Sequence, residues 1–378
     1  MRGHLQQRGR GTWRLKVFLG RSTDGRRRYV ERTVRGTRRE AERDLARLVV
    51  EVDEGRHVAA APITFAELVE QWLAVKALSV EASTLKNYEW AFRSYLAPAI
   101  GGRKLTAITP LELDRLYQSL YGGGLSARTV RICHTVVRQS LEQARRWGLL
   151  ARNPALDASP PSGRRRTITP PTIEQVRTLI ERATAEDPDF GTYLWLLAAT
   201  GCRRGEGCAL RWRDVDFDAA QLTIRRSIAM ANGVPYEKDT KTHQARRVAL
   251  DEGTIGVLRD HRRRMRERSL ALGVRLTEDA YVFADREGRA WRPDVCTNRF
   301  TRLRDQLGFA GVRLHDLRHF VATALGDAGT AIATISQRLG HRDIATTLNV
   351  YMHAIPATDQ IAAAHLGRLL APAANDDS

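Results

Sequence analysis

The regular spacing of apolar residues stops between residues 153 and 170 of this 378-residue chain. The segment contains Asn153-Pro154, a Ser-Pro-Pro-Ser-Gly run and three consecutive arginines, all typical of linkers rather than of helices or strands. Since the chain exceeds the length of one ordinary domain, the parts on either side of this break are long enough to bury separate cores. We therefore expect a multidomain protein with a linker at residues 153–170.

The first 60 residues predict a small sheet followed by a helix. Apolar and polar residues alternate from residue 12 to residue 34, interrupted by a turn at residues 22–25. Thr37 and Glu40 form the signature of a capping box before an amphipathic helical pattern. The strands are rich in arginine, and a sheet of this width fits the DNA major groove. The candidates for DNA contact are Arg26, Arg27 and Arg28. We interpret residues 1–60 as an accessory DNA-binding module, with a merely solvated basic face as the alternative.

Residues 63–152 contain only helical signals. Thr64 with Glu67 and Thr109 with Glu112 have the spacing of capping boxes, and Pro110 suits a first helical position. Apolar residues recur at helical spacing throughout the segment. This pattern predicts an all-α module of four helices.

Residues 171–378 combine helical patterns with strand patterns. Thr172 with Gln175 marks another helix start, and a short β-hairpin section is expected between about residues 221 and 250. We expect this largest domain to hold the chemistry. The predicted fold class is multidomain and mainly α with small β-sheets, the last domain being mixed α/β.

Charge favours a nucleic-acid partner. Lys plus Arg number 61 against 43 Asp plus Glu, a formal net charge of +18 that attracts a polyanion. The cysteines, Cys133, Cys202, Cys208 and Cys296, have neither zinc-ligand nor disulfide spacing and fall in segments that we expect to be helical or buried. No apolar run reaches the roughly 20 residues that span a bilayer, and no secretion signal is recognisable. We expect a cytoplasmic bacterial protein, bound to the nucleoid when on DNA, with no membrane partner.

Two motifs place cations where a phosphate can bind. Gly201 is expected to end an apolar helix and to direct Arg203 outward from a tight turn, where Glu206 can hydrogen-bond its guanidinium. His315 and Arg318 are three residues apart and share one helix face, so both can reach the same phosphate. Taken alone, the Arg203 motif is weak evidence for such a site, and an ordinary polar helix face is the better explanation of the His315–Arg318 pair.

Two further motifs lie near the end of the chain. Gly340 is expected to end a helix just before His341, and Tyr351 follows ten residues later. Taken alone, Tyr351 reads as a core aromatic, the commoner fate of tyrosine. Lys241 lies in Thr-Lys-Thr before a predicted strand, with Lys238 as a nearby alternative.

The stretches TGCRRGE, TKT, LHDLRH and LGHRDIATTLNVY, in this order and spacing, resemble the tyrosine recombinase family, which includes the phage and mobile-element integrases. The resemblance implies an arm-binding module, a helical core-binding (SAM-like) domain and a catalytic domain, in that order. It implies the catalytic residues Arg203, Lys241, His315, Arg318, His341 and Tyr351, with Glu206 supporting Arg203.

The chemistry suits these residue types. Displacement at a phosphodiester builds negative charge on the phosphate oxygens, which two guanidiniums can stabilise bidentately. A tyrosine hydroxyl, with a pKa near 10, attacks only if its proton is removed or its anion is stabilised. By the resemblance, Lys241 protonates the leaving 5′ oxygen and His341 donates to the phosphate. A phosphotyrosine that a 5′ hydroxyl can reverse requires no metal and no cofactor.

The resemblance also implies partners. It predicts a homotetramer on paired double-stranded DNA attachment sites, with an excisionase and a DNA-bending host factor as possible accessory proteins. The linker arginines Arg164, Arg165 and Arg166 are candidates for phosphate contact. The tail at residues 361–370 is expected to dock on a neighbouring protomer, with packing on its own domain as the alternative.

Three alternatives remain. A type IB topoisomerase or a telomere resolvase uses similar residues on a single duplex. A DNA-binding regulator retains the fold without the chemistry. A metal-dependent nuclease requires clustered carboxylates, for which Asp214 and Asp216 are candidates, although a structural turn explains these two better.

Overall fold

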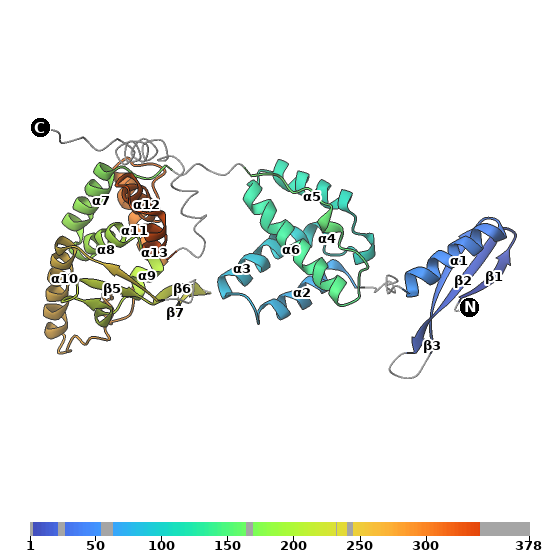
Figure 1. Ribbon diagram of the computed structural model, residues 1–378, viewed down its shortest axis with the longest axis horizontal. Helices are drawn as coiled ribbons and strands as arrows, with labels where there is room; N and C mark the ends of the chain where they lie inside the picture. Colours follow the sequence, from blue (N-terminus) through green and yellow to red (C-terminus); the bar gives the residue numbers. More distant parts are fainter. Residues whose placement is uncertain are drawn as a thin grey trace, which may run out of the picture. The chain divides into compact units, whose positions relative to one another are not determined.

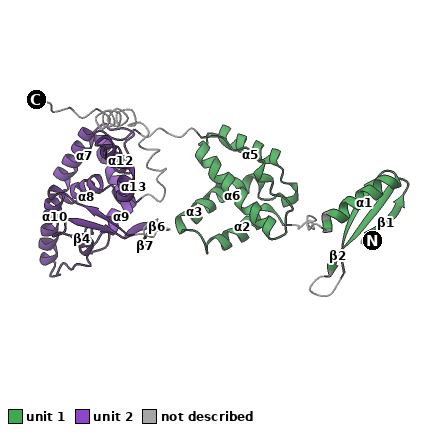
Figure 2. Cartoon of the chain, in the orientation of Figure 1, with its two compact units in different colours: residues 1–165 green, residues 166–378 purple. Residues whose placement is uncertain are grey.

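A computed structural model describes residues 3–21, 27–53, 63–163, 169–231, 233–239 and 245–340 (Figure 1). The chain divides into two compact units, residues 1–165 and residues 166–378 (Figure 2). No helix in the described ranges is both long enough and apolar enough to cross a bilayer.

The beginning of the chain forms an antiparallel sheet with one helix. The strands β1 (Gly3–Gly9), β2 (Thr12–Arg21) and β3 (Arg27–Arg35) are paired in that order, and α1 (Arg38–Asp53) follows. Leu15 and Val17, from the alternating pattern, are fully buried with Leu48 of the helix. The predicted capping box is confirmed, because the Thr37 amide donates to the Glu40 carboxylate over 2.8 Å. The sequence did not predict β1, since Leu5 is its one apolar residue and its order comes from pairing with β2.

The helical segment contains α2 (Phe65–Lys76), α3 (Ala82–Ala91), α4 (Ala97–Ile100), α5 (Pro110–Gly122) and α6 (Ala127–Arg146). The predicted capping boxes at the starts of α2 and α5 are present. The second of the four predicted helices continues from α3 into α4 through a π-helical turn at Phe92–Leu96. This turn lies just before Pro98, which has no amide hydrogen to donate. A buried core that includes Phe65, Trp72 and Tyr117 holds these helices together.

The second unit begins with three helices, α7 (Ile173–Glu186), α8 (Pro188–Thr200) and α9 (Arg204–Ala209). Strands β4 (Val215–Asp216), β5 (Gln221–Ile224) and β8 (Arg246–Ala249) form an antiparallel sheet in the order β4-β5-β8. Strands β6 (Arg226–Ala231) and β7 (Val234–Asp239) form a separate hairpin. The predicted hairpin section is therefore confirmed, and it also supplies strands to a second sheet.

The remaining helices are α10 (Glu252–Ala271), α11 (Pro293–Gln306), α12 (Asp316–Asp327) and α13 (Ile332–Leu339). Helix α8 lies at the centre of this unit and packs against α7, α10 and α12. Its residues are apolar around most of its circumference, as expected for a helix covered on several sides.

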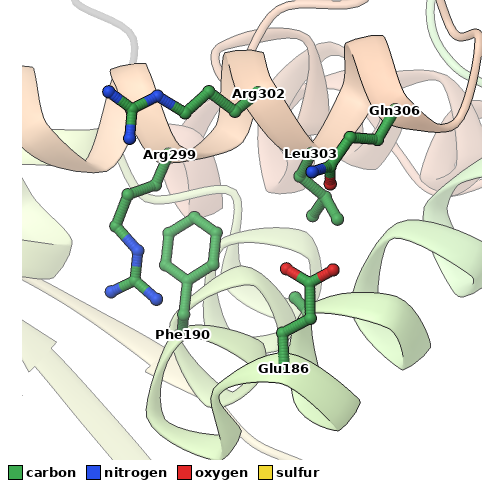
Figure 3. Close-up of a pocket in the computed structure, with 7 residues that line it drawn as sticks. Glu186, Phe190, Arg299, Arg302, Leu303 and Gln306 are labelled. Carbon is green, nitrogen blue, oxygen red and sulfur yellow. The ribbon is translucent and has the colours of Figure 1, made fainter.

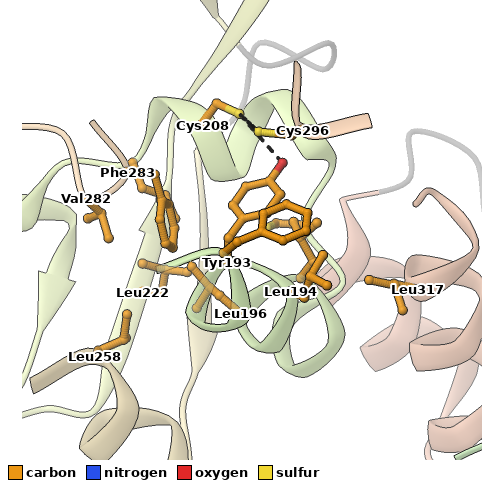
Figure 4. Close-up of a cluster of buried hydrophobic side chains, with 14 of the residues drawn as sticks. Tyr193, Leu194, Leu196, Cys208, Leu222, Leu258, Val282, Phe283, Cys296 and Leu317 are labelled. Atoms are coloured by element: carbon orange, nitrogen blue, oxygen red, sulfur yellow. Dashed lines mark hydrogen bonds between the residues drawn. The ribbon is translucent and has the colours of Figure 1, made fainter. Parts of the chain in front are cut away.

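The core around α8 includes three of the cysteines, and all four are buried with free thiols (Figure 4). The hydroxyl of Tyr193 is directed toward Cys208, with 3.6 Å between oxygen and sulfur. Cys208 and Cys296 lie 3.9 Å apart between their sulfur atoms. The expectation that these cysteines lie in buried segments is confirmed.

Candidate active site

The turn that carries Arg203 is built by Gly201. Gly201 ends α8 with a φ of 66°, a left-handed conformation that glycine adopts without strain. A Cβ atom at this position would collide with Cδ2 of Leu339, so α13 leaves no room for a side chain. Arg203 then lies in extended conformation as the residue that precedes α9.

Glu206 fixes the guanidinium of Arg203, as predicted. The Glu206 side chain is almost fully buried, and Nη1 of Arg203 donates to its Oε1 over 2.8 Å. The Arg203 amide donates to Oε2 over 2.8 Å, so the carboxylate holds both the backbone and the side chain of this arginine. Burial raises the pKa of Glu206, but Arg246 and Arg203 outweigh it and hold the pKa below its usual range.

Arg318 reaches the same turn from α12. Its side chain is buried, and Nη1 donates to the carbonyl oxygen of Gly201 over 2.7 Å. Its Nη2 is buried and has no hydrogen-bond partner among the described residues. Burial, followed by the charge of Arg203, lowers the pKa of Arg318, yet a guanidinium stays protonated in proteins. A buried cationic donor without an acceptor is the expected preparation for an anionic ligand.

His315 immediately precedes α12, and Arg318 follows in the first turn of that helix. His315 as a whole residue is exposed, but surrounding protein atoms desolvate its imidazole ring and lower the pKa of His315 to about 4. Electrostatic interactions with His319, Arg318 and Arg203 act in the same direction. His315 is therefore neutral at pH 7 and available for proton exchange.

The end of α13 belongs to the same cluster. Nη2 of Arg203 donates to the carbonyl oxygen of Gly340 over 3.1 Å. Gly340 ends α13 with a φ of 65°, which confirms the predicted helix stop. His341 is the next residue in the sequence. The structure thus gathers Arg203, Glu206 and Arg318 with the residue that precedes His341.

Several predicted residues lie outside the described ranges. Lys241, His341 and Tyr351 are among them, as are Arg26, Arg164, Arg165, Arg166 and the tail at residues 361–370. Arg27 is an exposed residue of β3, and of Arg28 only the backbone is described. The register of β3 on β2 places Arg27 opposite Arg21.

Sequence reasoning missed Arg246 as a member of the cluster. This arginine opens β8, and its Nη2 donates to Oε2 of Glu206 over 2.6 Å. The sequence showed it only as one of two arginines at the start of a strand. The available signal was the two-residue period of the predicted strand, which places Arg246 on the same face as Val248 and Leu250.

The carboxylates considered for a metal nuclease have structural partners. Asp214 accepts from the Arg211 amide over 3.0 Å and pairs with Arg225 at 2.8 Å. Asp216 accepts from the amides of Asp218 and Ala219 in the turn before β5. This arrangement favours the structural turn over the metal-site interpretation.

A cavity of about 200 Å³ lies between the α7–α8 region and α11, and none of the predicted catalytic residues lines it (Figure 3). The guanidinium of Arg299 lies 4.2 Å from the centre of the Phe190 ring. It also donates to the Asp187 carboxylate over 2.6 Å, so Arg299 has structural partners of its own.

The arginine cluster is suited to hold an anionic group, and comparison with known sequences identifies the family. Residues 171–357 match the Phage integrase family, and residues 64–121 match the N-terminal SAM-like domain of phage integrases. A tyrosine recombinase XerC-like protein of Caldanaerobacter subterraneus subsp. tengcongensis is 27% identical to this chain. The match covers 92% of this chain and 94% of the relative.

Solved structures show the same fold. A Tn1549 transposon integrase in complex with transposon right end DNA is 20% identical, with a TM-score of 0.70 over 82% of this chain and 100% of that chain. A lambda integrase tetramer bound to a Holliday junction is 16% identical, with a TM-score of 0.59 over 92% of this chain and 94% of that chain. With both family matches in order along the sequence, this chain belongs to the phage integrase family of tyrosine recombinases.

Proposed function

We propose that the chain is a site-specific recombinase in which Arg203 and Arg318 hold the scissile phosphate and Tyr351 attacks it. The observation that carries the proposal is the buried Nη2 of Arg318, a charged donor without an acceptor among the described residues. Nonbridging oxygens of a phosphodiester supply the missing acceptor, and their negative charge grows as the pentavalent state forms. The proposal assigns this stabilisation to the two guanidiniums.

Each remaining residue has a defined part in the proposed reaction. The Tyr351 oxygen forms a bond to phosphorus, while the bond from phosphorus to the 5′ oxygen breaks. Neutral His315 assists removal of the tyrosine proton, and Lys241 protonates the leaving 5′ oxygen. His341 donates a hydrogen bond to the phosphate. A 5′ hydroxyl from the second duplex then reverses the phosphotyrosine, and the bond energy is conserved.

We further propose how the parts of the chain divide this work. The sheet module at residues 1–60 binds arm-type DNA through Arg26, Arg27 and Arg28, residues 63–152 bind the core site, and residues 171–378 catalyse. The linker at residues 153–170 contacts phosphates through its arginines. The lambda integrase tetramer on a Holliday junction supports assembly as a homotetramer on paired sites.

The biological setting belongs to the same proposal. Similarity to the Tn1549 transposon integrase supports the proposal that the reaction integrates or excises a mobile element. The protein then acts in the bacterial cytoplasm, and an excisionase and a DNA-bending host factor set the direction. The tail at residues 361–370 docks on the neighbouring protomer.

A suicide substrate tests the proposal. The attachment site, found by sequencing the junctions of the element, is built into a duplex nicked beside the cleavage point, so that the short leaving strand diffuses away. In EDTA, wild type is expected to form a covalent adduct on a denaturing gel, whereas Tyr351→Phe forms none. The matched control is Tyr121→Phe, an exposed tyrosine of α5 that is expected to behave as wild type. Failure of wild type to form an adduct on DNA that it binds would instead favour the non-catalytic regulator.

A further inference from the structure

We propose that Arg246 is a positioning residue that sets the net charge of the cluster around Arg203, orients Arg203 through Glu206 and fixes the end of α13 beside it. The inference rests on the proposed function, because it names the residue that prepares the phosphate site. Arg246 itself has no direct role in the proposed reaction and is buried behind the cluster, with 8% of its surface exposed.

The hydrogen bonds of Arg246 are shared between two elements. Nη2 and Nη1 donate to Oε2 and Oε1 of Glu206 over 2.6 and 3.3 Å. Nε donates in another direction, to the carbonyl oxygen of Arg338 over 3.0 Å. Only the planar fork of an arginine supplies three such donors in fixed directions. Arg246 therefore joins β8 to α9 and to the last turn of α13.

The charge of Arg246 determines what Arg203 can offer to a phosphate. Oε1 of Glu206 accepts from Arg203 and from Arg246 at the same time. One carboxylate between two guanidiniums leaves a net positive charge, whereas Glu206 with Arg203 alone is a neutral pair. In a buried site this difference acts directly on a bound anion, because little solvent screens it. Arg246 thus keeps the group net positive while Glu206 holds Arg203 in place.

The two arginines also bind the same helix end. The last carbonyl groups of a helix have no partner within the helix and carry its negative dipole end. In α13, Arg246 binds the carbonyl of Arg338 and Arg203 binds that of Gly340. A Cβ atom on Gly340 would lie 2.9 Å from Cδ of Arg246, so the backbone is packed directly against this side chain. Since His341 follows Gly340, the same contacts fix where the chain toward His341 begins.

A double-mutant cycle tests whether Arg246 acts through Arg203. Single-turnover adduct formation on the nicked duplex is measured at saturating DNA for wild type, Arg246→Met, Arg203→Met and the double variant. We expect Arg246→Met to slow adduct formation about 100-fold, the size of effect that follows from misplacing a catalytic group. In the Arg203→Met background the same change is expected to cost clearly less than in wild type, because only the contact of Arg246 with the end of α13 remains to be lost. Equal losses in both backgrounds, or a wild-type rate for Arg246→Met, would overturn the proposal.

Two controls separate positioning from a general loss of structure. Arg247→Met alters the exposed neighbour on β8 and is expected to retain the wild-type rate and dissociation constant. Arg246→Lys keeps the charge but loses the fork, so its rate is expected to fall between wild type and Arg246→Met, with unchanged DNA affinity. If Arg246→Met does not unfold cooperatively, Arg246→Lys takes its place in the cycle. Absence of an adduct with wild type overturns the proposed function, whereas an adduct with wild type and additive losses overturns only the role of Arg246.

Discussion

Arg318 donates a hydrogen bond from Nη1 to the carbonyl oxygen of Gly201 over 2.7 Å, between residues 117 positions apart in the sequence. This bond joins α12 to the turn that directs Arg203. It also orients the guanidinium, so that Nη2 remains available as a buried donor. One half of the Arg318 guanidinium therefore maintains the structure, and the other half has no hydrogen-bond partner among the described residues.

Arg318→Lys is expected to slow adduct formation about 100-fold at saturating DNA, the typical effect of removing one preorganised donor. Lysine keeps a positive charge but cannot donate to Gly201 and to a phosphate in the fixed directions of a guanidinium. Rapid-quench measurement on the nicked duplex gives the rate. Arg266→Lys, an exposed position of α10, serves as control and is expected to have no effect. A full rate with Arg318→Lys would contradict the fork geometry.

Gly201→Ala is expected to destabilise the protein by about 2 kcal/mol, because alanine is strained in the left-handed region and its Cβ meets Leu339. Urea unfolding followed by circular dichroism measures the change. The matched control is Gly256→Ala in α10, where nothing lies within 4 Å of the added atom. In that exposed helical position alanine is expected to stabilise by about 0.5–1 kcal/mol. Stability changes of the same sign at Gly201 and Gly256 would show that the left-handed conformation and the contact with Leu339 do not determine the effect at Gly201.

Asp189→Asn is expected to destabilise the second unit by about 2 kcal/mol, since it removes the charge of a buried carboxylate that pairs with His261 and with partly exposed arginines. Asp189 lies 3.0 Å from Nδ1 of His261, whose Nε2 lies 2.7 Å from the carbonyl oxygen of Val282. Burial raises the pKa of Asp189, but His261 and Arg268 outweigh it and hold the pKa far below its usual range.

The pH dependence of Asp189→Asn has a definite sign. A carboxyl group with a depressed pKa stabilises the fold above its unfolded pKa of about 4, and this contribution is lost as the pH falls. Urea midpoints of wild type and variant should therefore differ fully near neutral pH and converge below about pH 4. The control Asp260→Asn, an exposed pair with Arg263 on α10, is expected to change stability by less than about 0.5 kcal/mol. A constant difference down to pH 2 would show that the charge of Asp189 is not responsible.

His315 is expected to titrate far below the ordinary histidine range in the DNA-free protein, with a pKa of about 4. A bound phosphate brings negative charge that favours the imidazolium, so the midpoint is expected to rise when DNA binds. NMR titration of labelled histidine rings measures both values, and His315→Gln assigns the resonance. An unshifted midpoint near 6.5 in the free protein would show that the ring is neither desolvated nor close to the arginines.

The sequence by itself determined the features that depend on short spacing. Thr64 with Glu67, Thr172 with Gln175 and Arg203 with Glu206 each interact three residues apart, as predicted. The geometry of one helical turn fixes these distances, so the sequence spacing alone predicts the contacts. Gly201 and Gly340 end their helices for a similarly local reason, because glycine adopts the left-handed conformation without strain.

Only the tertiary structure decided which distant residues complete the site. Glu206 meets Arg246 from 40 positions away, and Arg318 meets Gly201 from 117. No fixed spacing encodes such pairs, because their distance depends on how α8, β8, α12 and α13 pack together. The same holds for β1, whose single apolar residue gives no strand pattern and whose order comes from pairing with β2. The sequence thus supplied the chemical groups, and the burial of Glu206 between Arg203 and Arg246 decided how the two guanidiniums are held.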